Sequence, residues 1–274
     1  MPNFWHIDGS PGDTLAPSSW SQAELCPKTK LPTPSKWAQE AIHITANKIQ
    51  RSVLDSPSQR LILCCNRQWG KSTVIAIKAL HHALTHPNSS IVVVSRTEKQ
   101  GGELINRLKA FANVASIPGR RVPGYDFSFL LENGSKIVAI AHSTETGPCR
   151  TADVLIYDEA AIVKDAVFSV TLPFIAYTGG AVWMMSTPRA QLGFFYNFWH
   201  DNDPQWTRVF STVDDCPEIS QAFLDLHRKG APDDFRREFY CEFTQPAGRL
   251  TTRERVRACY NPALSARKLP SLKL

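Results

Sequence analysis

Short apolar runs rich in β-branched residues recur between residues 61 and 185. A segment with apolar residues at helical spacing, from Ser72 to about Thr85, follows the first run. Fully apolar strands interleaved with helices are typical of a parallel sheet that is covered on both faces. The pattern predicts an α/β fold with strands at Leu61–Cys65, Ile91–Ser95, Val154–Tyr157 and Ala181–Met185.

The dipeptide Asn133-Gly134 indicates an antiparallel addition to this sheet. Asn-Gly is the strongest short-range hairpin signal, because both residues accept the positive φ of a tight turn. The flanking segments Phe127–Leu131 and Lys136–Ala141 have strand character. The sheet is therefore predicted to be mixed but mostly parallel. Upstream, apolar residues at helical spacing predict one helix from Trp37 to about Val53.

The composition excludes several classes of protein. With 43% hydrophobic and 20% charged residues among 274, the chain is globular rather than disordered or collagen-like. No apolar run approaches the roughly 20 residues that span a bilayer, and no secretory signal is recognisable, so we expect a soluble protein without a membrane partner. The seven cysteines are scattered without CxxC spacing, which predicts reduced, mostly buried thiols rather than disulfides or a zinc site.

The net charge of +6 is concentrated at the carboxyl-terminal end. Residues 246–274 contain seven Lys or Arg and one acid, whereas residues 1–245 balance at 24 basic and 24 acidic side chains. Clustered basic residues with little apolar periodicity cannot form a core, but they suit contacts with DNA phosphates or an acidic partner. Bulk charge therefore gives no indication that the body of the protein binds DNA.

A candidate phosphate-binding loop follows the first predicted strand. Residues 65–73 have the sequence Cys-Asn-Arg-Gln-Trp-Gly-Lys-Ser-Thr and lead into a predicted helix. A loop that feeds a helix N-terminus directs backbone N–H groups and the helix dipole at one point, which favours a phosphate. In this motif Gly70 lets the backbone approach, Lys71 reaches the β- and γ-phosphate oxygens, and Ser72 holds Mg²⁺. The predicted nucleotide-binding residues of the loop are Arg67, Gln68, Trp69, Gly70, Lys71, Ser72 and Thr73.

One position of this loop departs from the general Walker A pattern. The first glycine of that pattern would fall at residue 65, which is Cys65 here. An exposed helix start with a lone lysine is therefore the alternative interpretation of the loop.

Two adjacent carboxylates, Asp158 and Glu159, end the apolar run Val154–Tyr157. In P-loop NTPases an Asp at the tip of a strand next to the P-loop holds Mg²⁺, and an acid one position later can polarise the attacking water. The alternative is that the two acids simply end a strand or cap a helix. Because both motifs occur in one chain, with room for intervening strands between them, together they predict an ATPase core that uses ATP and Mg²⁺.

A third predicted strand ends in Ser186, Thr187 and Pro188. Hydroxyl groups at the tip of a central strand can sense whether a γ-phosphate is present. They can then pass that state to the part of the protein that grips the substrate. A turn with a proline after a strand is the alternative interpretation.

These motifs together resemble the ATPase domain of the large terminase subunit of tailed bacteriophages, the motor that packages DNA. The resemblance extends from about Leu31 to Tyr260. That family's Walker A motif typically lacks the first glycine and carries Arg-Gln ahead of the Gly-Lys, as Arg67-Gln68 does here. The other matching segments are Asn133–Ile137, Arg150, Asp158–Ala161, Ser186–Pro188, Gly193–Tyr196, Asp215–Pro217 and Phe235–Phe243.

The resemblance implies roles for residues that match the family's motifs. It places Lys71 on the phosphates, Ser72 and Asp158 on Mg²⁺, and Glu159 as the catalytic carboxylate. It also suggests that Arg67 is a sensor within the P-loop. The segment Ser186-Thr187-Pro188 would couple hydrolysis to movement.

Two further implied roles concern Arg150 and Gln39. Arg150, eight positions before Asp158, is the candidate arginine finger, whose guanidinium would neutralise charge that develops on the γ-phosphate. A surface salt bridge is the alternative. Family members often place a Trp-Gln pair near the adenine, which indicates Gln39, although Ala38 separates it from Trp37. An ordinary position on a helix surface is the alternative for Gln39.

The function implied by the resemblance is ATP hydrolysis that drives double-stranded DNA into a phage capsid, in the cytoplasm of the bacterial host. The implied partners are the DNA, the portal protein and the small terminase subunit, and the implied assembly is a ring of identical chains. Two alternatives are a helicase-like DNA-dependent ATPase and an inactive P-loop module that binds DNA or a packaging partner.

The sequence predicts four parts: an extended arm at 1–35, a P-loop ATPase core at 36–214, a small helical lid at 215–245, and a basic linker or tail at 246–274. Large terminases usually continue into a nuclease domain, which needs clustered carboxylates. Glu254 is the only acid after Pro246. No nuclease activity is therefore expected from these residues.

Overall fold

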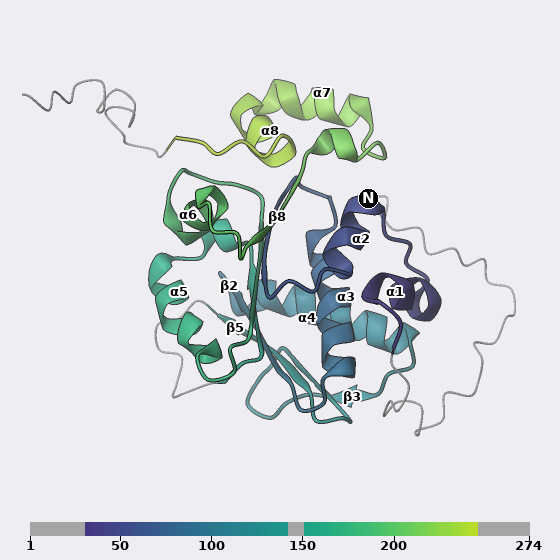
Figure 1. The fold of residues 1–274 in the computed structure, drawn as a ribbon. Coiled ribbons are helices and arrows are strands. Elements are labelled where there is room, and N and C mark those ends of the chain that lie inside the picture. The colour runs from purple at the N-terminus through teal and green to yellow at the C-terminus, as the bar shows by residue number, and fades with distance from the viewer. Residues whose placement is uncertain (1–30, 142–150, 246–274) are drawn as a thin grey trace, which may run out of the picture. The chain divides into compact units, whose positions relative to one another are not determined.

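The computed structural model of the chain describes residues 31–141 and 151–245. In these ranges eight strands form one sheet, and helices pack against it (Figure 1). The strands are β1 Arg60–Cys65, β2 Ser90–Ser95, β3 Gly119–Arg120, β4 Ser128–Leu131, β5 Lys136–Ala141, β6 Val154–Asp158, β7 Ala181–Ser186 and β8 Thr207–Ser211. The α-helices are α1 Pro34–Ile42, α2 Lys48–Leu54, α3 Lys71–Thr85, α4 Glu98–Val114, α5 Asp165–Thr171, α6 Gly193–His200, α7 Gln221–Gly230 and α8 Pro232–Phe239.

The sheet has the strand order β3-β4-β5-β2-β6-β7-β1-β8. The six strands from β5 to β8 pair in parallel, and β4 is antiparallel to both of its neighbours. The four strands predicted from apolar runs, the helix after the first of them, and the hairpin around Asn133-Gly134 are therefore confirmed. The predicted α/β class with a mixed, mostly parallel sheet is confirmed as well.

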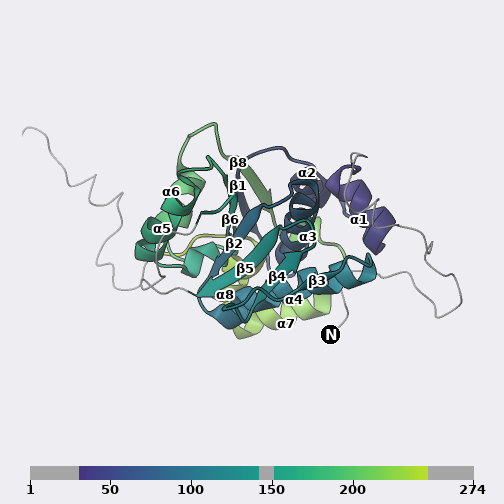
Figure 2. The same cartoon turned by 90° about the horizontal axis from the view of Figure 1, so that it is seen from below.

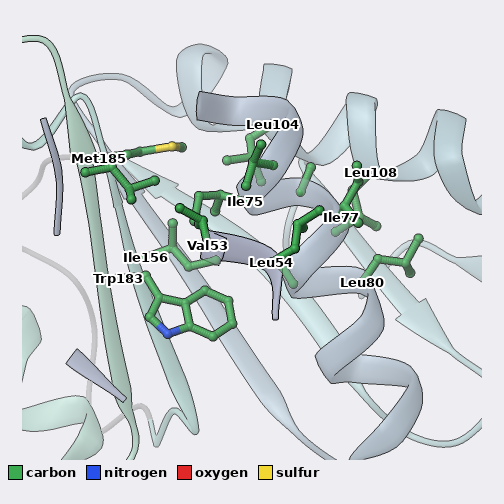
Figure 3. Close-up of a cluster of buried hydrophobic side chains, with 14 of the residues drawn as sticks. Val53, Leu54, Ile75, Ile77, Leu80, Leu104, Leu108, Ile156, Trp183 and Met185 are labelled. Atoms are coloured by element: carbon green, nitrogen blue, oxygen red, sulfur yellow. The ribbon is translucent and has the colours of Figure 1, made fainter. Parts of the chain in front are cut away.

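Alternation along the strands divides the apolar core into two layers. In β1, Leu61 and Leu63 belong to the cluster that includes side chains of α1 to α4, whereas Ile62 and Cys64 belong to the cluster with α5 and α6. Figure 2 shows these two groups of helices on opposite sides of the sheet. Figure 3 shows the first cluster, where Trp183 of β7 lies among side chains of α2 and α3. Because successive side chains point to opposite faces, a strand buried on both faces is apolar throughout.

The single helix predicted from Trp37 to Val53 is wrong, because the structure divides it into α1 and α2. His43 has a φ of 56° and ends α1 in the left-handed region. Asn47 then caps α2 and forms a reciprocal capping box with Gln50. Apolar spacing continues across the break, so the periodicity alone did not indicate it.

Helices α7 and α8 lie within the segment predicted as a lid, residues 215–245. Leu224 of α7 and both Phe235 and Phe239 of α8 belong to the same core cluster as α1 to α4. Apolar side chains of α7 and α8 therefore share one buried cluster with side chains of α1 to α4, and the division into core and lid stays a prediction.

Two further features of the described ranges concern membranes and thiols. No helix within residues 31–141 and 151–245 is long and apolar enough to cross a membrane. The cysteines of these ranges, Cys64, Cys65, Cys216 and Cys241, are free and buried. The predicted burial of the thiols is thus confirmed for these four.

Candidate active site

The carboxyl ends of β6, β7 and β1 bring the predicted site residues to one edge of the sheet. Cys64 of β1 pairs with Ser186 of β7, and Met185 pairs with Asp158 of β6. Strand β7 lies between β1 and β6 in the sheet. Strand order depends on packing between segments far apart in the chain, which local patterns do not record. Ser186 consequently lies between the P-loop and the two carboxylates.

Two residues with left-handed backbone conformation shape the P-loop. Gln68 has a φ of 69° and Gly70 has a φ of 92°. Only glycine adopts such a φ without strain, which explains Gly70 immediately before α3. The first N–H groups of a helix have no partner within the helix and attract anions. This end of α3 is therefore suited to a phosphate, as the sequence predicted.

Lys71, the first residue of α3, is buried although it carries a charge. Its ammonium group donates to the carbonyl oxygens of Cys65 at 2.9 Å and Asn66 at 3.0 Å. Only 9% of the residue is exposed. A buried charge is costly unless it is hydrogen-bonded, so these carbonyls stabilise the ammonium close to the loop. The ammonium group is thus held in place by the loop itself.

Trp69 contributes to the P-loop from within the core rather than from its surface. Its side chain is 2% exposed and packs with the core cluster, so contact between Trp69 and a nucleotide is restricted to the backbone. The Trp69 carbonyl accepts a hydrogen bond from Nε2 of the buried Gln50 at 2.9 Å. Gln39, which the sequence indicated for the adenine, is exposed on α1. Sequence reasoning missed Gln50, although its place three residues after Asn47 is a capping-box signal.

The remaining two residues of the Gly-Lys-Ser-Thr segment differ in exposure. Ser72 is half-buried, whereas Thr73 is 1% exposed. The hydroxyl of Thr73 accepts a hydrogen bond from the guanidinium of Arg107, which lies on α4. A second cation therefore lies beside the first turn of α3, and the sequence pattern gave no indication of it.

Asp158 is a buried carboxyl group at the end of β6. Burial and the neighbouring Glu159 raise its pKa to about 7, although Lys71 acts in the opposite direction. A cation bound to this carboxylate would offset the cost of burying the charge. The carboxylate of Asp158 and the hydroxyl of Ser72 are the hard oxygen donors that Mg²⁺ prefers. These residues therefore fit a magnesium site.

Glu159 adopts a left-handed backbone conformation, with φ 50° and ψ 47°. Its carboxylate accepts a hydrogen bond from the hydroxyl of Ser186 at 3.3 Å, and that hydroxyl accepts one from the N–H of Ala161 at 3.3 Å. A left-handed residue other than glycine is strained and is often found at functional sites. Thr187 and Pro188, the other predicted coupling residues, are buried beyond Ser186.

Arg67 joins the P-loop to helix α8 of the lid. Its guanidinium lies 2.8 Å from the carboxylate of Glu238, and its backbone N–H donates to the Glu238 carbonyl at 2.7 Å. Burial raises the pKa of Glu238, but hydrogen bonds from Arg67 and Arg237 outweigh it, so the pKa lies below its usual value. Sequence reasoning placed Arg67 at the nucleotide but did not identify Glu238.

Arg150, the predicted arginine finger, lies outside the described residues, as do residues 246–274.

The comparison that decides the family is a match to the sequence profile of the terminase large subunit, T4-like-virus type, N-terminal region. It covers residues 63–257, well over half of the 274 residues. The chain belongs to this terminase family. It is a terminase ATPase domain, part of a DNA-packaging motor, and the resemblance noted from the motifs is confirmed.

Solved terminase structures share the fold of this terminase domain. The ATPase domain of the large terminase of Thermus phage P74-26 is 20% identical, with a TM-score of 0.66, over 78% of this chain and 100% of that one. The large terminase of another thermophilic bacteriophage, solved with ADP, is 15% identical, with a TM-score of 0.63, over 73% of this chain and 54% of that one. The large terminase of bacteriophage HK97 is 17% identical, with a TM-score of 0.61, over 72% of this chain and 50% of that one. The matched region thus spans about half the length of the last two proteins.

Proposed function

We propose that Lys71, Ser72, Asp158 and Glu159 carry out the ATP hydrolysis of this packaging motor. The observation that supports this most is the position of the P-loop, Ser186 and the two carboxylates at the ends of three adjoining strands. Phosphoryl transfer depends mainly on positioning and on neutralising charge, rather than on covalent chemistry by the protein. A rigid sheet edge with a buried ammonium and two carboxylates provides both.

Lys71 and the first turn of α3 bind the phosphates in this proposal. The ammonium of Lys71, now tethered to two loop carbonyls, is within the same loop that presents the helix N-terminus. It neutralises charge on the β- and γ-phosphates as the bond to the leaving group lengthens. Arg67 and the backbone of residues 68–73 complete the nucleotide-binding loop. Bound nucleotides are known for a relative, because the thermophilic-phage large terminase solved with ADP was also solved with ATP-γ-S.

Asp158 and Glu159 have different functions, which their environments set. Asp158 and the Ser72 hydroxyl would hold Mg²⁺, which when bound would neutralise negative charge on the phosphates. Glu159 orients the attacking water and accepts its proton. The hydrogen bond from Ser186 would orient the carboxylate of Glu159 for this role. Arg150 would supply the guanidinium that stabilises the transition state.

We further propose that the substrate moved is double-stranded DNA, and that the partners are a portal protein and a small terminase subunit. The family supports this proposal, since its members are packaging terminases. The basic residues 246–274 would contact DNA phosphates. Ser186 ends β7, and Thr187 and Pro188 follow it directly. These three residues would transmit hydrolysis to movement. A ring of chains would allow Arg150 to complete the site of its neighbour.

ATP turnover with and without duplex DNA tests the proposed function. We expect turnover that requires Mg²⁺ and rises when duplex DNA is added. DNA binding across a salt series should also differ between the full chain and a chain ending at Gln245, because each lost phosphate contact changes the log–log slope by about 0.9. An inactive P-loop module would bind nucleotide or DNA without turnover. Equal affinities and slopes would show that the tail does not contact DNA.

A further inference from the structure

Thr73 lies in the first turn of α3, where the backbone N–H groups are free to bind an anion. The first hydrogen bond of the helix joins the Val74 N–H to the Gly70 carbonyl at 3.0 Å. The N–H groups of Lys71, Ser72 and Thr73 precede that bond, so they have no acceptor within the helix. Such groups are the donors that bind a phosphate at a helix N-terminus. Thr73 therefore contributes one of these three donors.

The side chain of Thr73 connects this turn to helix α4. Thr73 is 1% exposed, and its hydroxyl accepts a hydrogen bond from the guanidinium of Arg107 at 2.5 Å. Leu104 and Leu108 of α4 lie beside α3 in one buried cluster (Figure 3). Because these leucines pack α4 against α3, the backbone of Arg107 has a fixed position relative to α3.

Arg107 is a cation without an acidic partner in the part of the chain that the structure describes. It is exposed and forms no ion pair with any acid of residues 31–141 or 151–245. The hydrogen bond to Thr73 uses one of the five N–H donors of the guanidinium. Since the hydroxyl is uncharged, the positive charge of Arg107 is not neutralised at this position.

The same face of α4 lies near the two proposed catalytic carboxylates. Burial and Glu159 raise the pKa of Asp158, and the negative charge of Glu103 on α4 adds to this rise. Glu103 precedes Arg107 by four residues, so both side chains project from one face of the helix. Charges on this face of α4 therefore act on the proposed site.

We propose that Arg107 is a positioning residue of the phosphate site, which holds Thr73 in the first turn of α3 and adds a second positive charge to that of Lys71. The hydrogen bond restricts the side chain of Thr73, and with it the N–H of the same residue. The guanidinium stabilises a bound phosphate through its charge rather than through direct contact.

The effect of Arg107 is expected on binding rather than on chemistry. The backbone N–H groups of a P-loop surround the α- and β-phosphates, which ADP and ATP share. An interaction that is equal in the ground state and the transition state lowers KM without raising kcat. Arg107 therefore increases affinity for both nucleotides. This inference deepens the proposed function and rests on it, because it takes the N-terminus of α3 as the phosphate site.

Calorimetric titration of the full chain with ADP and Mg²⁺, at low and at raised salt concentration, tests the inference. Arg107→Gln retains a donor for Thr73 but removes the charge, and the exposed position should allow the variant to fold. At low salt its dissociation constant for ADP should rise about two- to five-fold, the factor that a partly exposed pair of charges supplies. The difference from the unmodified chain should shrink as salt screens the charge. KM for ATP should rise in parallel while kcat stays the same.

Further variants separate the charge from the hydrogen bond. Arg107→Lys retains the charge and should bind ADP more tightly than Arg107→Gln does. Thr73→Val removes the hydroxyl at similar size and should weaken ADP binding. When Thr73→Val is already present, adding Arg107→Gln should have a smaller effect, because the guanidinium is no longer held at this turn. Arg120→Gln, the control, removes an exposed arginine on β3, at the outer edge of the sheet, and should leave ADP affinity unchanged.

Unchanged ADP affinity in Arg107→Gln would overturn the inference, as would an equal loss in Arg120→Gln. A loss that does not depend on salt would overturn the contribution of the charge. Full additivity of Arg107→Gln and Thr73→Val would overturn the route through Thr73. Failure of the proposed function is a separate outcome, because the unmodified chain would then neither bind ADP nor hydrolyse ATP.

Discussion

The hydroxyl of Ser186 donates to the carboxylate of Glu159 at 3.3 Å and accepts the N–H of Ala161 at 3.3 Å. Ser186 is fully buried at the end of β7, the strand between the P-loop strand and the strand of Asp158. Ser186 thus holds the carboxylate of Glu159, the proposed base, and belongs to β7, which connects the P-loop strand β1 to the strand of Asp158, β6. The hydrogen bond between Ser186 and Glu159 is a direct contact through which Ser186 could perform the coupling role predicted for it.

Removing that hydroxyl should affect chemistry more than binding. In Ser186→Ala the Glu159 carboxylate loses a partner and its orientation, so kcat should fall about ten-fold while KM for ATP changes little. Steady-state ATP turnover measures both values. Ser95→Ala is the matched control, because Ser95 is also buried at a strand tip but its hydroxyl donates to Thr97. Equal kcat for Ser186→Ala and the unmodified chain would remove the positioning role.

Gln50 should affect binding more than chemistry. Gln50→Met retains the length of the side chain but removes the donor to the Trp69 carbonyl. KM for ATP should rise about five-fold, since a neutral hydrogen bond contributes about 1 kcal/mol. Asn47→Ala is the control, because it removes the cap of α2 without touching the P-loop. If both variants raise KM equally, the effect comes from α2 stability and not from the contact.

The lowered pKa of His82 predicts how the free energy of unfolding responds to acid. Burial, together with the nearby His86 and Lys78, lowers its pKa to about 4, while Asp153 acts in the opposite direction. Since the pKa in the unfolded chain is about 6.5, the folded state favours the neutral ring. The stability contributed by that neutral ring is fully present above pH 6.5. It is lost as the pH falls toward 4, by on the order of 2 to 3 kcal/mol.

His82→Gln should therefore flatten the loss of stability between pH 6.5 and pH 4. Urea unfolding at a series of pH values measures the free energy of unfolding. His200→Gln, at an exposed position on α6, is the control. An identical pH profile for His82→Gln and the unmodified chain would contradict the assignment to His82.

A mixture of two inactive variants tests whether Arg150 acts on a neighbouring chain. Arg150→Ala retains the P-loop, and Lys71→Ala retains the finger. If the finger acts across the ring, mixing the two should restore part of the ATP turnover, because each supplies what the other lacks. The measurement is ATPase activity as a function of the mixing ratio. Mixtures with no activity, from variants that fold and assemble, would place the finger within one chain or at another residue.

The sequence predicted the elements whose signals are local. The apolar runs of β1, β2, β6 and β7 and the Asn133-Gly134 turn mark their strands, and the Gly-Lys-Ser segment marks the start of α3. Helix α4 was not recognised, because Gly101 and Gly102 disfavour a helix interior. A Cβ at Gly102 would lie 2.3 Å from the ring of Phe127. The glycines therefore allow α4 to pack closely against the sheet, which only the tertiary structure explains.

The parts of the site that the sequence did not predict depend on contacts over long distances in the chain. Glu238 meets Arg67 across 171 positions, and Arg107 meets Thr73 across 34. Strand order has the same origin, and for this reason the place of β7 between β1 and β6 was not predicted. The P-loop and the Asp158-Glu159 pair can be recognised from their residue types alone. The residues that orient them belong to no motif that the sequence shows.

The measurement that tests the account most directly is ATP binding and turnover in Glu159→Gln. Because the amide cannot accept the proton of the attacking water, this variant should bind ATP with Mg²⁺ and fail to hydrolyse it. Lys71→Ala should lose both binding and turnover, and Glu132→Gln, in the hairpin turn, should retain both. Wild-type turnover in Glu159→Gln would contradict the assignment of the catalytic carboxylate and with it the proposed site.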